Sequence, residues 1–371
     1  MKDTINRYAE NLKQVRTTPP IQHFCKIIVE EFVQNFSVYG KHFYRTLAGR
    51  TGVLIRFFLH KYAIFRKIEM AITTCVCYNN ANRYERIGDI SMWKQKIGIS
   101  LYNSYVKPTL EVVDIIKQTG FEAVSPEWDK KVDLKEIVDH ARSIGLEVQS
   151  LHAPYTGSHH MWESDPALWE PAYEDLLASL QAAADCSIPI LVIHAWIGFI
   201  YTMKPNADGF SNFERLVNEA TRLGVKIAIE NTEGEEFLAA LMEHFKGNET
   251  VGFCWDSGHE MCYNHSEDML ALYGDRLIMT HLNDNLGIRP FEGNVFWHDD
   301  LHLLPYDGVA DWDYNIQRLK ASKKMDILNF ELNINSKPDR HENDVYKNLP
   351  LEQYFAEAYN RACRIAYRYS R

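Results

Sequence analysis

The chain has 371 residues, of which 46% are hydrophobic, 24% charged and 12% aromatic, with a mean hydropathy of −0.32. This composition excludes a disordered chain and a fibrous repeat, and the length suits one α/β barrel with an added segment. The net charge of −10 argues against nonspecific nucleic-acid binding. The seven cysteines are an odd number without paired metal-knuckle spacing, so we expect reduced thiols in a cytoplasmic protein.

The first 91 residues differ in charge from the rest of the chain. Residues 1–91 carry a charge of +7 and residues 92–371 a charge of −17, which predicts a domain boundary near Met92. Helical spacing at 21–36, after Pro19 and Pro20, predicts a mostly helical N-terminal extension. This segment has no signal-peptide pattern, and its most apolar stretch is too short to be transmembrane. It is either a helical appendage or a basic arm for a membrane surface or a partner.

From residue 96 onward, short β-branched runs alternate with amphipathic helical patterns. The predicted strands are 96–102, 121–127, 146–152, 188–194, 226–231, 251–256, 276–281 and 327–332. The predicted helices include 110–120, 134–145, 173–186, 213–224 and 351–369. Because parallel strands need crossovers of this kind, the pattern predicts an α/β fold, a (β/α)8 TIM barrel over 92–371. A doubly wound open sheet is the alternative, but no glycine-rich phosphate loop follows the first strand.

Metal-binding side chains stand at or just after the ends of six predicted strands. This strand-end cluster consists of His152, His194, Glu230, Asp256, His259, His281, Asp300, His302 and Glu331. In a barrel these ends meet on one face, so we expect the nine side chains in one small volume. Buried carboxylates need a neutralising cation, which predicts a divalent ion such as Mn²⁺, Mg²⁺, Co²⁺ or Zn²⁺. A single histidine in such a place is more often a core residue, so the joint pattern carries the prediction.

The motifs around the strand-end cluster resemble those of the xylose-isomerase-like barrel superfamily of sugar and sugar-phosphate isomerases and epimerases. They are IAIENTEG, CWDSGHE, THLNDN, HLLPYDGVADWD and FELN, and the resemblance spans residues 96–369. The resemblance implies that one divalent metal ion is bound by Glu230, Asp256, His281 and Glu331. It further implies proton transfer by Glu230 and Glu331 through a metal-stabilised ene-diolate, with His259 holding a substrate oxygen.

The same superfamily contains the endonuclease IV type of DNA repair enzyme, which holds three zinc ions with nine ligands. All nine ligand types find a match in the strand-end cluster. The charge of −17 and the lack of basic loops after the strands favour a carbohydrate over a nucleic acid. Aromatic residues in these loops suit a sugar ring or ordinary packing; they are Trp128, Trp162, Trp196, Phe199, Tyr201, Phe291, Phe296 and Trp297.

We therefore expect a metal-dependent isomerase or epimerase of a carbohydrate, with a homo-oligomer left open. The predicted substrate contacts are His152, His194, Asp300, His302 and Trp196. Asp300 and His302 lie in a long loop, 283–311, where they either reach the substrate or only pin the loop. The alternatives are an inositol-type dehydratase or carbohydrate lyase on the same scaffold, an endonuclease IV-like zinc phosphodiesterase, and a noncatalytic sugar sensor.

No phosphate-binding loop is visible at the seventh or eighth strand, which favours an unphosphorylated sugar. Lys337 and Arg340, which follow the last strand, could bind an anion or lie in a solvated loop.

Overall fold

The structure is a computed structural model that describes residues 93–371, except for 201–202, 266 and 288–296. The predicted N-terminal extension, 1–91, therefore lies outside the described residues, and its helical character and role stay predictions. Three of the aromatic residues that the sequence singles out, Tyr201, Phe291 and Phe296, also lie outside them.

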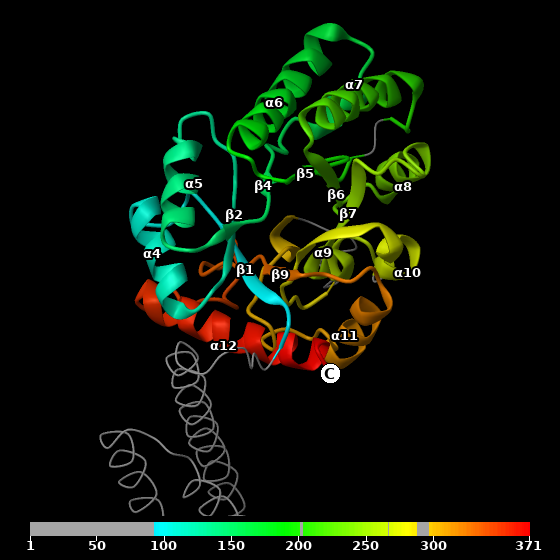
Figure 1. The fold of residues 1–371 in the computed structure, drawn as a ribbon. Helices are drawn as coiled ribbons and strands as arrows, with labels where there is room; N and C mark the ends of the chain where they lie inside the picture. Colours follow the sequence, from blue (N-terminus) through cyan, green and yellow to red (C-terminus); the bar gives the residue numbers. More distant parts are fainter. Residues whose placement is uncertain (1–92, 201–202, 266, 288–296) are drawn as a thin grey trace, which may run out of the picture. The chain divides into compact units, whose positions relative to one another are not determined.

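Strands and helices alternate along the described chain (Figure 1). The strands are β1 (Lys96–Leu101), β2 (Ala123–Pro126), β3 (Glu147–Val148), β4 (Leu151–His152), β5 (Ile190–His194), β6 (Lys226–Glu230), β7 (Val251–Asp256), β8 (Leu277–His281) and β9 (Ile327–Phe330). The α-helices are α4 (Thr109–Thr119), α5 (Leu134–Ser143), α6 (Pro166–Asp185), α7 (Ala207–Leu223), α8 (Glu235–His244), α9 (Ser257–Cys262), α10 (Met269–Tyr273), α11 (Trp312–Ala321) and α12 (Leu351–Tyr369). Short 3-10 helices are η1 (Ser158–Trp162), η2 (Gly274–Arg276) and η3 (Trp297–Asp299).

The strands form one closed ring, and each recorded strand pair is parallel. One sheet has the order β3-β2-β1-β9 and the other β4-β5-β6-β7-β8. Single parallel bridges join the two sheets, from Glu127 to His152 and from Leu282 to Phe330. The predicted (β/α)8 barrel is therefore confirmed, and the open doubly wound sheet is not formed.

The third predicted strand differs from expectation because it is split in two. The range 146–152 was predicted as one strand, but it forms β3 and β4, which are separated by Gln149 and Ser150. The reason is a change of partner, since β3 pairs with β2 and β4 pairs with β5. The two halves together occupy one position in the ring.

Helix α6 begins seven residues earlier than the sequence pattern predicts. The Asp165 side chain accepts a hydrogen bond from the Ala167 N–H and caps the helix, and Pro166 follows at the first helical position. Both features favour a helix start, and the helix then continues through Pro171. Helix α12, in contrast, begins and ends at the predicted residues, 351 and 369.

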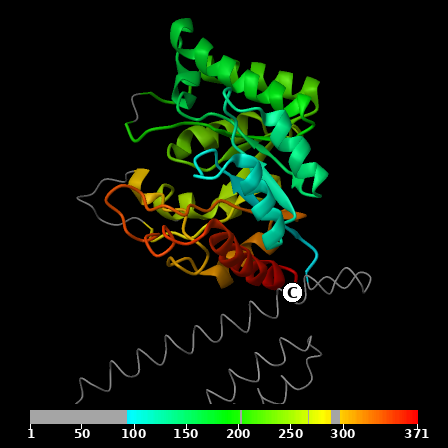
Figure 2. The same ribbon diagram turned by 90° about the vertical axis from the view of Figure 1, so that its left-hand side faces the viewer.

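The helices surround the strands, and the last helix completes the layer. Helix α12 packs against α4 on one side and α11 on the other, so the two ends of the barrel domain lie next to each other (Figure 1). The long helices α6 and α7 lie side by side, as Figure 2 shows. In the part of the chain that the structure covers, no helix combines the length and apolarity needed to cross a membrane.

A small apolar cluster inside the ring forms the floor under four of the polar strand ends. It contains Ile190, Val192, Ala228, Cys254 and Met279. Because side chains two residues apart share one face of a strand, this cluster continues directly into His194, Glu230, Asp256 and His281. Strand register also places His194 opposite Glu230 and Asp256 opposite His281.

Candidate functional site

The strand-end cluster comes together on one face of the barrel as the sequence predicts. Eight of its nine side chains are buried, and His152 is partly exposed. Their metal-binding atoms form several groups, and within each group all the atoms lie within 4.8 Å of one another. One of these groups is the predicted metal site of Glu230, Asp256, His281 and Glu331, which we call the four-ligand group.

The four-ligand group centres on the His281 ring. Its Nδ1 lies 2.8 Å from Glu230 Oε1 and 2.9 Å from Glu331 Oε2. One ring nitrogen carries at most one proton, so it cannot donate fully to both carboxylates. Asp256 completes the group from the end of β7, and its side chain also caps α9 by accepting from the His259 N–H.

The carboxylates of the four-ligand group have strongly shifted acidities. Burial raises the pKa of Glu230, but contacts with His281, His152 and His194 outweigh burial and hold the pKa well below its ordinary value. Burial also raises the pKa of Glu331, but His281 lowers it to about 2. Asp256 has no direct imidazole hydrogen bond to its carboxylate, and burial together with nearby Glu230 raises its pKa to about 6. These opposite shifts are expected where like charges share a dry site.

His152 and His194 both point at the second oxygen of Glu230. The distances from Glu230 Oε2 are 3.2 Å to His152 Nε2 and 3.1 Å to His194 Nε2. The other ring nitrogen of His152, Nδ1, lies 2.8 Å from the Ala153 carbonyl oxygen. A Nδ1–H that donates to this carbonyl leaves Nε2 facing the carboxylate, which is how histidines that bind metals are commonly oriented. Glu230 is therefore shared between two possible metal-binding groups.

The long loop after β8 brings Asp300 and His302 into the same site. Asp300 Oδ2 lies 2.7 Å from His302 Nε2, and Asp300 Oδ1 lies 3.4 Å from His259 Nε2. We call His259, Asp300 and His302 the Asp300 group, and its donor atoms also lie within 4.8 Å of one another. His302 has a φ of +48°, so the pair meets on a left-handed residue.

Lys337 and Arg340 both form ion pairs, and Lys337 is partly buried while Arg340 is buried, so the interpretation of a solvated loop is wrong. Lys337 Nζ lies 3.2 Å from Asp300 Oδ2, and the Lys337 side chain is only 19% exposed. Arg340 pairs with Asp299, the residue before Asp300 in the loop after β8. Both basic residues thus face the loop that carries Asp300, and the loop after β9 becomes part of the site wall.

Asparagines hold the ligand-bearing backbone, and sequence reasoning missed their role. Asn231, directly after Glu230, accepts from the Asp256 N–H and donates to the Asp256 carbonyl oxygen. Asn283 donates to Asp256 Oδ2 at 2.9 Å. A side chain on Gly258 would bring its Cβ within 1.9 Å of Asn283 Oδ1, so glycine is needed for this approach. The signal in the sequence was an asparagine one or two residues after a strand end.

Tyrosines, and not the predicted tryptophans, flank the histidines. Tyr155 is 45% exposed and stacks on His194 with 5.0 Å between ring centroids. Tyr263 stacks on His259 at 4.9 Å. Trp196 is buried and stacks on Phe237, so its packing is that of a core residue and its predicted substrate contact stays a prediction. Trp162 is buried as well, whereas Trp297 is 47% exposed.

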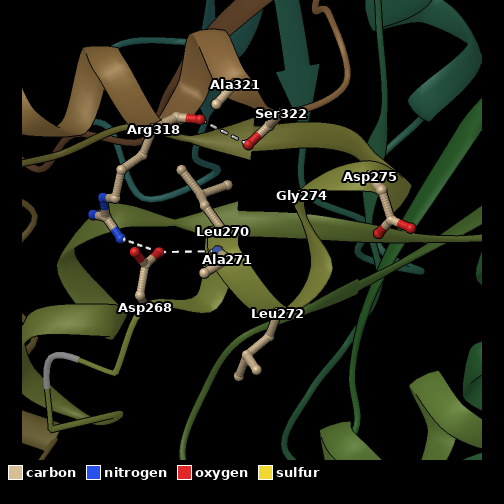
Figure 3. A pocket seen from close by; sticks show the side chains of 9 residues that line it. All are labelled: Asp268, Leu270, Ala271, Leu272, Gly274, Asp275, Arg318, Ala321 and Ser322. Atoms are coloured by element: carbon tan, nitrogen blue, oxygen red, sulfur yellow. Dashed lines mark hydrogen bonds and ion pairs between the residues drawn. The ribbon is translucent and has the colours of Figure 1, made fainter.

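A pocket of about 470 Å³ lies elsewhere, between α10, η2 and α11 (Figure 3). Its lining includes Asp268, Ser322 and Arg318 but no member of the strand-end cluster. Figure 3 shows the Arg318 guanidinium turned onto Asp268. The strand-end cluster and this pocket are therefore separate features of the barrel.

A family model described as xylose isomerase-like TIM barrel matches residues 113–350 of this chain. The chain belongs to this family. Among curated proteins, the uncharacterized protein y4fM of Sinorhizobium fredii (strain NBRC 101917 / NGR234) is 26% identical, and the match covers 74% of this chain and 97% of that protein.

Two solved structures of this fold are similar along most of the barrel domain. The IOLI protein with a bound zinc atom is 16% identical with a TM-score of 0.59, over 74% of this chain and 99% of that chain. A D-allulose 3-epimerase from Methylomonas sp. is 16% identical with a TM-score of 0.55, over 74% of this chain and 98% of that chain. At this identity the likeness demonstrates a shared fold.

Proposed function

We propose that this member of the family is a divalent-metal-dependent isomerase or epimerase of a sugar or sugar derivative. The observation that carries the proposal is the four-ligand group, in which Glu230, Asp256, His281 and Glu331 converge at the carboxyl ends of the strands. This is the face on which enzymes of this architecture carry out their chemistry. The epimerase among the structures that share the fold adds a reason to look first at ketoses.

The donor set of the four-ligand group fits a divalent ion of the hard or borderline kind. It offers three carboxylates and one imidazole, which suits Mn²⁺, Mg²⁺, Co²⁺ or Zn²⁺. Cys254 lies near Glu230 and His281 but is not a member of the four-ligand group, and burial raises the pKa of its thiol to about 12. When bound, the ion would polarise a substrate carbonyl and acidify the neighbouring C–H.

Glu230 and Glu331 are placed to move the proton of that C–H. Both carboxylates have a depressed pKa and are ionised at neutral pH, so each can accept a proton from carbon. They lie on β6 and just after β9, and the His281 ring stands between them. One carboxylate removes the proton and the other returns one, which either inverts the carbon or moves the carbonyl.

Histidines and tyrosines around the four-ligand group orient the substrate and limit water. His259 is buried beside the group and holds a substrate oxygen through its ring, while Asp300 and His302 contact further hydroxyls. Tyr155 and Tyr263 stack on histidines at the rim and present flat faces to a sugar ring. Partial exclusion of water lets a carboxylate act as a base at a carbon acid.

The site gives no reason to prefer a phosphorylated sugar. Lys337 and Arg340 are already paired with Asp300 and Asp299, so neither offers an unneutralised charge to a phosphate group. We therefore propose an unphosphorylated ketose, cyclitol or glycoside as the substrate class.

A second candidate function is phosphodiester hydrolysis with three zinc ions. The observation that favours it is the arrangement of two further groups around the four-ligand group, which are His152–His194–Glu230 and the Asp300 group. Together the three groups use all nine residues of the strand-end cluster. Elemental analysis separates the candidates, because the isomerase proposal requires one ion per chain and the hydrolase requires three.

The experiment that tests the proposal measures both the sugar product and the incorporation of solvent deuterium into it. The protein loaded with Mn²⁺ is incubated in D₂O with free ketoses and, in parallel, with their phosphorylated forms. We expect an isomerised or epimerised free sugar with deuterium at the carbon beside the carbonyl. Product without deuterium contradicts proton exchange through a solvent-accessible carboxylate and leaves shielded proton return or a hydride shift. Turnover of phosphorylated sugars alone contradicts the substrate class.

A further inference from the structure

The Asp300 group has the donors of a second metal site. His259 Nδ1 lies 3.0 Å from the Asn231 carbonyl oxygen, and His302 Nδ1 lies 3.2 Å from the Glu331 carbonyl oxygen. A Nδ1–H donated to each carbonyl leaves both Nε2 atoms directed at Asp300. This is the orientation of histidines that bind a metal ion, so the donors by themselves suit a divalent ion.

A positive charge already contacts the carboxylate of this group. Lys337 comes from the segment after β9, and its Nζ lies 3.2 Å from the same Asp300 oxygen that contacts His302. Its ammonium also lies 5.7 Å from the centre of the Trp297 ring, a favourable cation–π position. The Lys337 side chain is 81% removed from solvent, which places its charge within the site wall.

We propose that Lys337 is the resident cation of the Asp300 group and keeps a divalent ion out of it. Asp300 is the only carboxylate of this group, and one ammonium neutralises it. A divalent ion bound to the same carboxylate would lie a few ångströms from the ammonium, and like charges at such a distance repel strongly where solvent is excluded. The four-ligand group has three carboxylates, and in the described residues none of them pairs with a lysine or arginine.

In this arrangement Lys337 determines how many metal ions the strand-end cluster binds. With Lys337 in place, the ion is confined to the four-ligand group, and Asp300 and His302 remain available for substrate hydroxyls. The inference rests on the proposed function with a single ion. It extends that proposal by naming the residue that prevents a second ion from binding. Lys337 is a positioning residue in this sense, since it acts through Asp300.

The test is a comparison of zinc stoichiometry between variants of the full chain. Wild type, Lys337→Met and Lys337→Arg are dialysed against excess Zn²⁺ and then against metal-free buffer, and bound zinc is measured by elemental analysis. Methionine keeps the length and the apolar stem of lysine without its charge. We expect Lys337→Met to bind one equivalent more than wild type, and Lys337→Arg to bind the same number as wild type.

Two further variants show where the additional ion binds and provide a control for the measurement. In Lys337→Met combined with Asp300→Asn, the additional equivalent should be lost, because the carboxylate of the Asp300 group is gone. Lys204→Met removes an exposed lysine on another part of the barrel and should leave the zinc content at the wild-type number. Retention of the wild-type equivalent in every variant shows that the four-ligand group is still folded.

The outcomes separate this inference from the proposed function. If Lys337→Met binds no more zinc than wild type, or if Lys337→Arg gains an ion, Lys337 does not exclude a cation and the inference is overturned, whatever the activity of the protein. If Lys337→Met gains one equivalent but the wild type exchanges no deuterium into any carbohydrate, the inference holds and the isomerase proposal fails.

Discussion

Two clusters of charged side chains in this barrel differ in the groups that neutralise their carboxylates. In the first, Arg318 of α11 lies between Glu260 and Asp268, at 2.7 Å from each carboxylate. In the second, the four-ligand group gathers three carboxylates around His281. The first cluster carries its own permanent cation, whereas the second has only histidines, whose charge depends on bound protons.

The difference indicates which buried charges serve stability and which serve binding. Trp255 Nε1 donates to Glu260, and the Arg318 guanidinium lies over the Trp255 ring, so this network is closed by its own side chains. Each of these two carboxylates therefore already has a cationic partner. Among the described residues, the ion-pair partners of Glu230, Asp256 and Glu331 are histidines alone. This is the arrangement that we propose for binding a cation from outside.

Replacement of Glu331 by glutamine should have the largest effect on turnover. The variant loses a proton acceptor and a charged ligand, and we expect a decrease of about 10²–10⁴-fold in turnover, the usual range for a general base. Turnover is measured on the ketose found in the deuterium experiment, with Glu352→Gln on the exposed side of α12 as the control. Wild-type turnover in Glu331→Gln would remove Glu331 from the proposed mechanism.

Replacement of Arg318 by methionine should act on stability instead. It leaves Glu260 buried without its cation, which typically costs about 3–5 kcal/mol in the free energy of unfolding. Urea denaturation measures the loss, and elemental analysis should find the metal content of the folded variant unchanged. The exposed Arg222, which pairs with Glu219, provides the control: Arg222→Met should change stability by less than about 0.5 kcal/mol.

A smaller effect is expected at His302, at the edge of the strand-end cluster. His302→Ala removes a substrate contact and the partner of Asp300, and it should lower turnover at least tenfold, about 1.4 kcal/mol. The ion content should stay as in wild type, since His302 is outside the four-ligand group. The exposed His341 serves as the control. An ion lost with His302 would instead favour the polynuclear hydrolase.

We expect the smallest effect at Asp268, whose contribution to the free energy of unfolding depends on pH. Burial raises the pKa of this carboxyl, but hydrogen bonds from Arg318 and from the Ala271 N–H outweigh it and lower the pKa below 3.8. A depressed pKa stabilises the fold above the ordinary pKa, and the gain disappears as pH falls through the lowered value.

Asp268→Asn retains the helix cap and isolates the charge. Because Asp268 is 35% exposed, we expect a loss of less than about 1 kcal/mol at pH 6 that shrinks toward pH 3. Urea denaturation at both pH values checks this. A difference that grows as pH falls would contradict the sign of the shift.

Residues at strand ends could be predicted from the sequence because the chain itself encodes where a strand stops. Glu230 and Asp256 directly follow runs of apolar residues, and the parallel order of the strands then requires these ends to meet. His152 was also found in this way, although its strand proved to be split in two. Strand ends alone predict the nine residues of the strand-end cluster, whereas the choice of the four-ligand group among them is implied by the resemblance to the barrel superfamily.

Loop residues could not be predicted in this way, because no local pattern sets their position. Tyr155 and Tyr263 stack on His194 and His259 only after loops from different strands have folded over the barrel. The sequence favours a solvated side chain for Lys337 over an anion contact, and neither interpretation includes Asp300, which is 37 residues away in the chain.

The amino-acid sequence by itself determined the alternation of strands and helices, the barrel and the convergence of metal-binding side chains, because each depends on short-range periodicity and on the fixed direction of parallel strands. The tertiary structure alone decided which cation neutralises which carboxylate. That choice depends on distances of a few ångströms between segments remote in sequence, as between Lys337 and Asp300 or Arg318 and Glu260. Electrostatic energy varies steeply over such distances, and periodicity in the chain does not specify them.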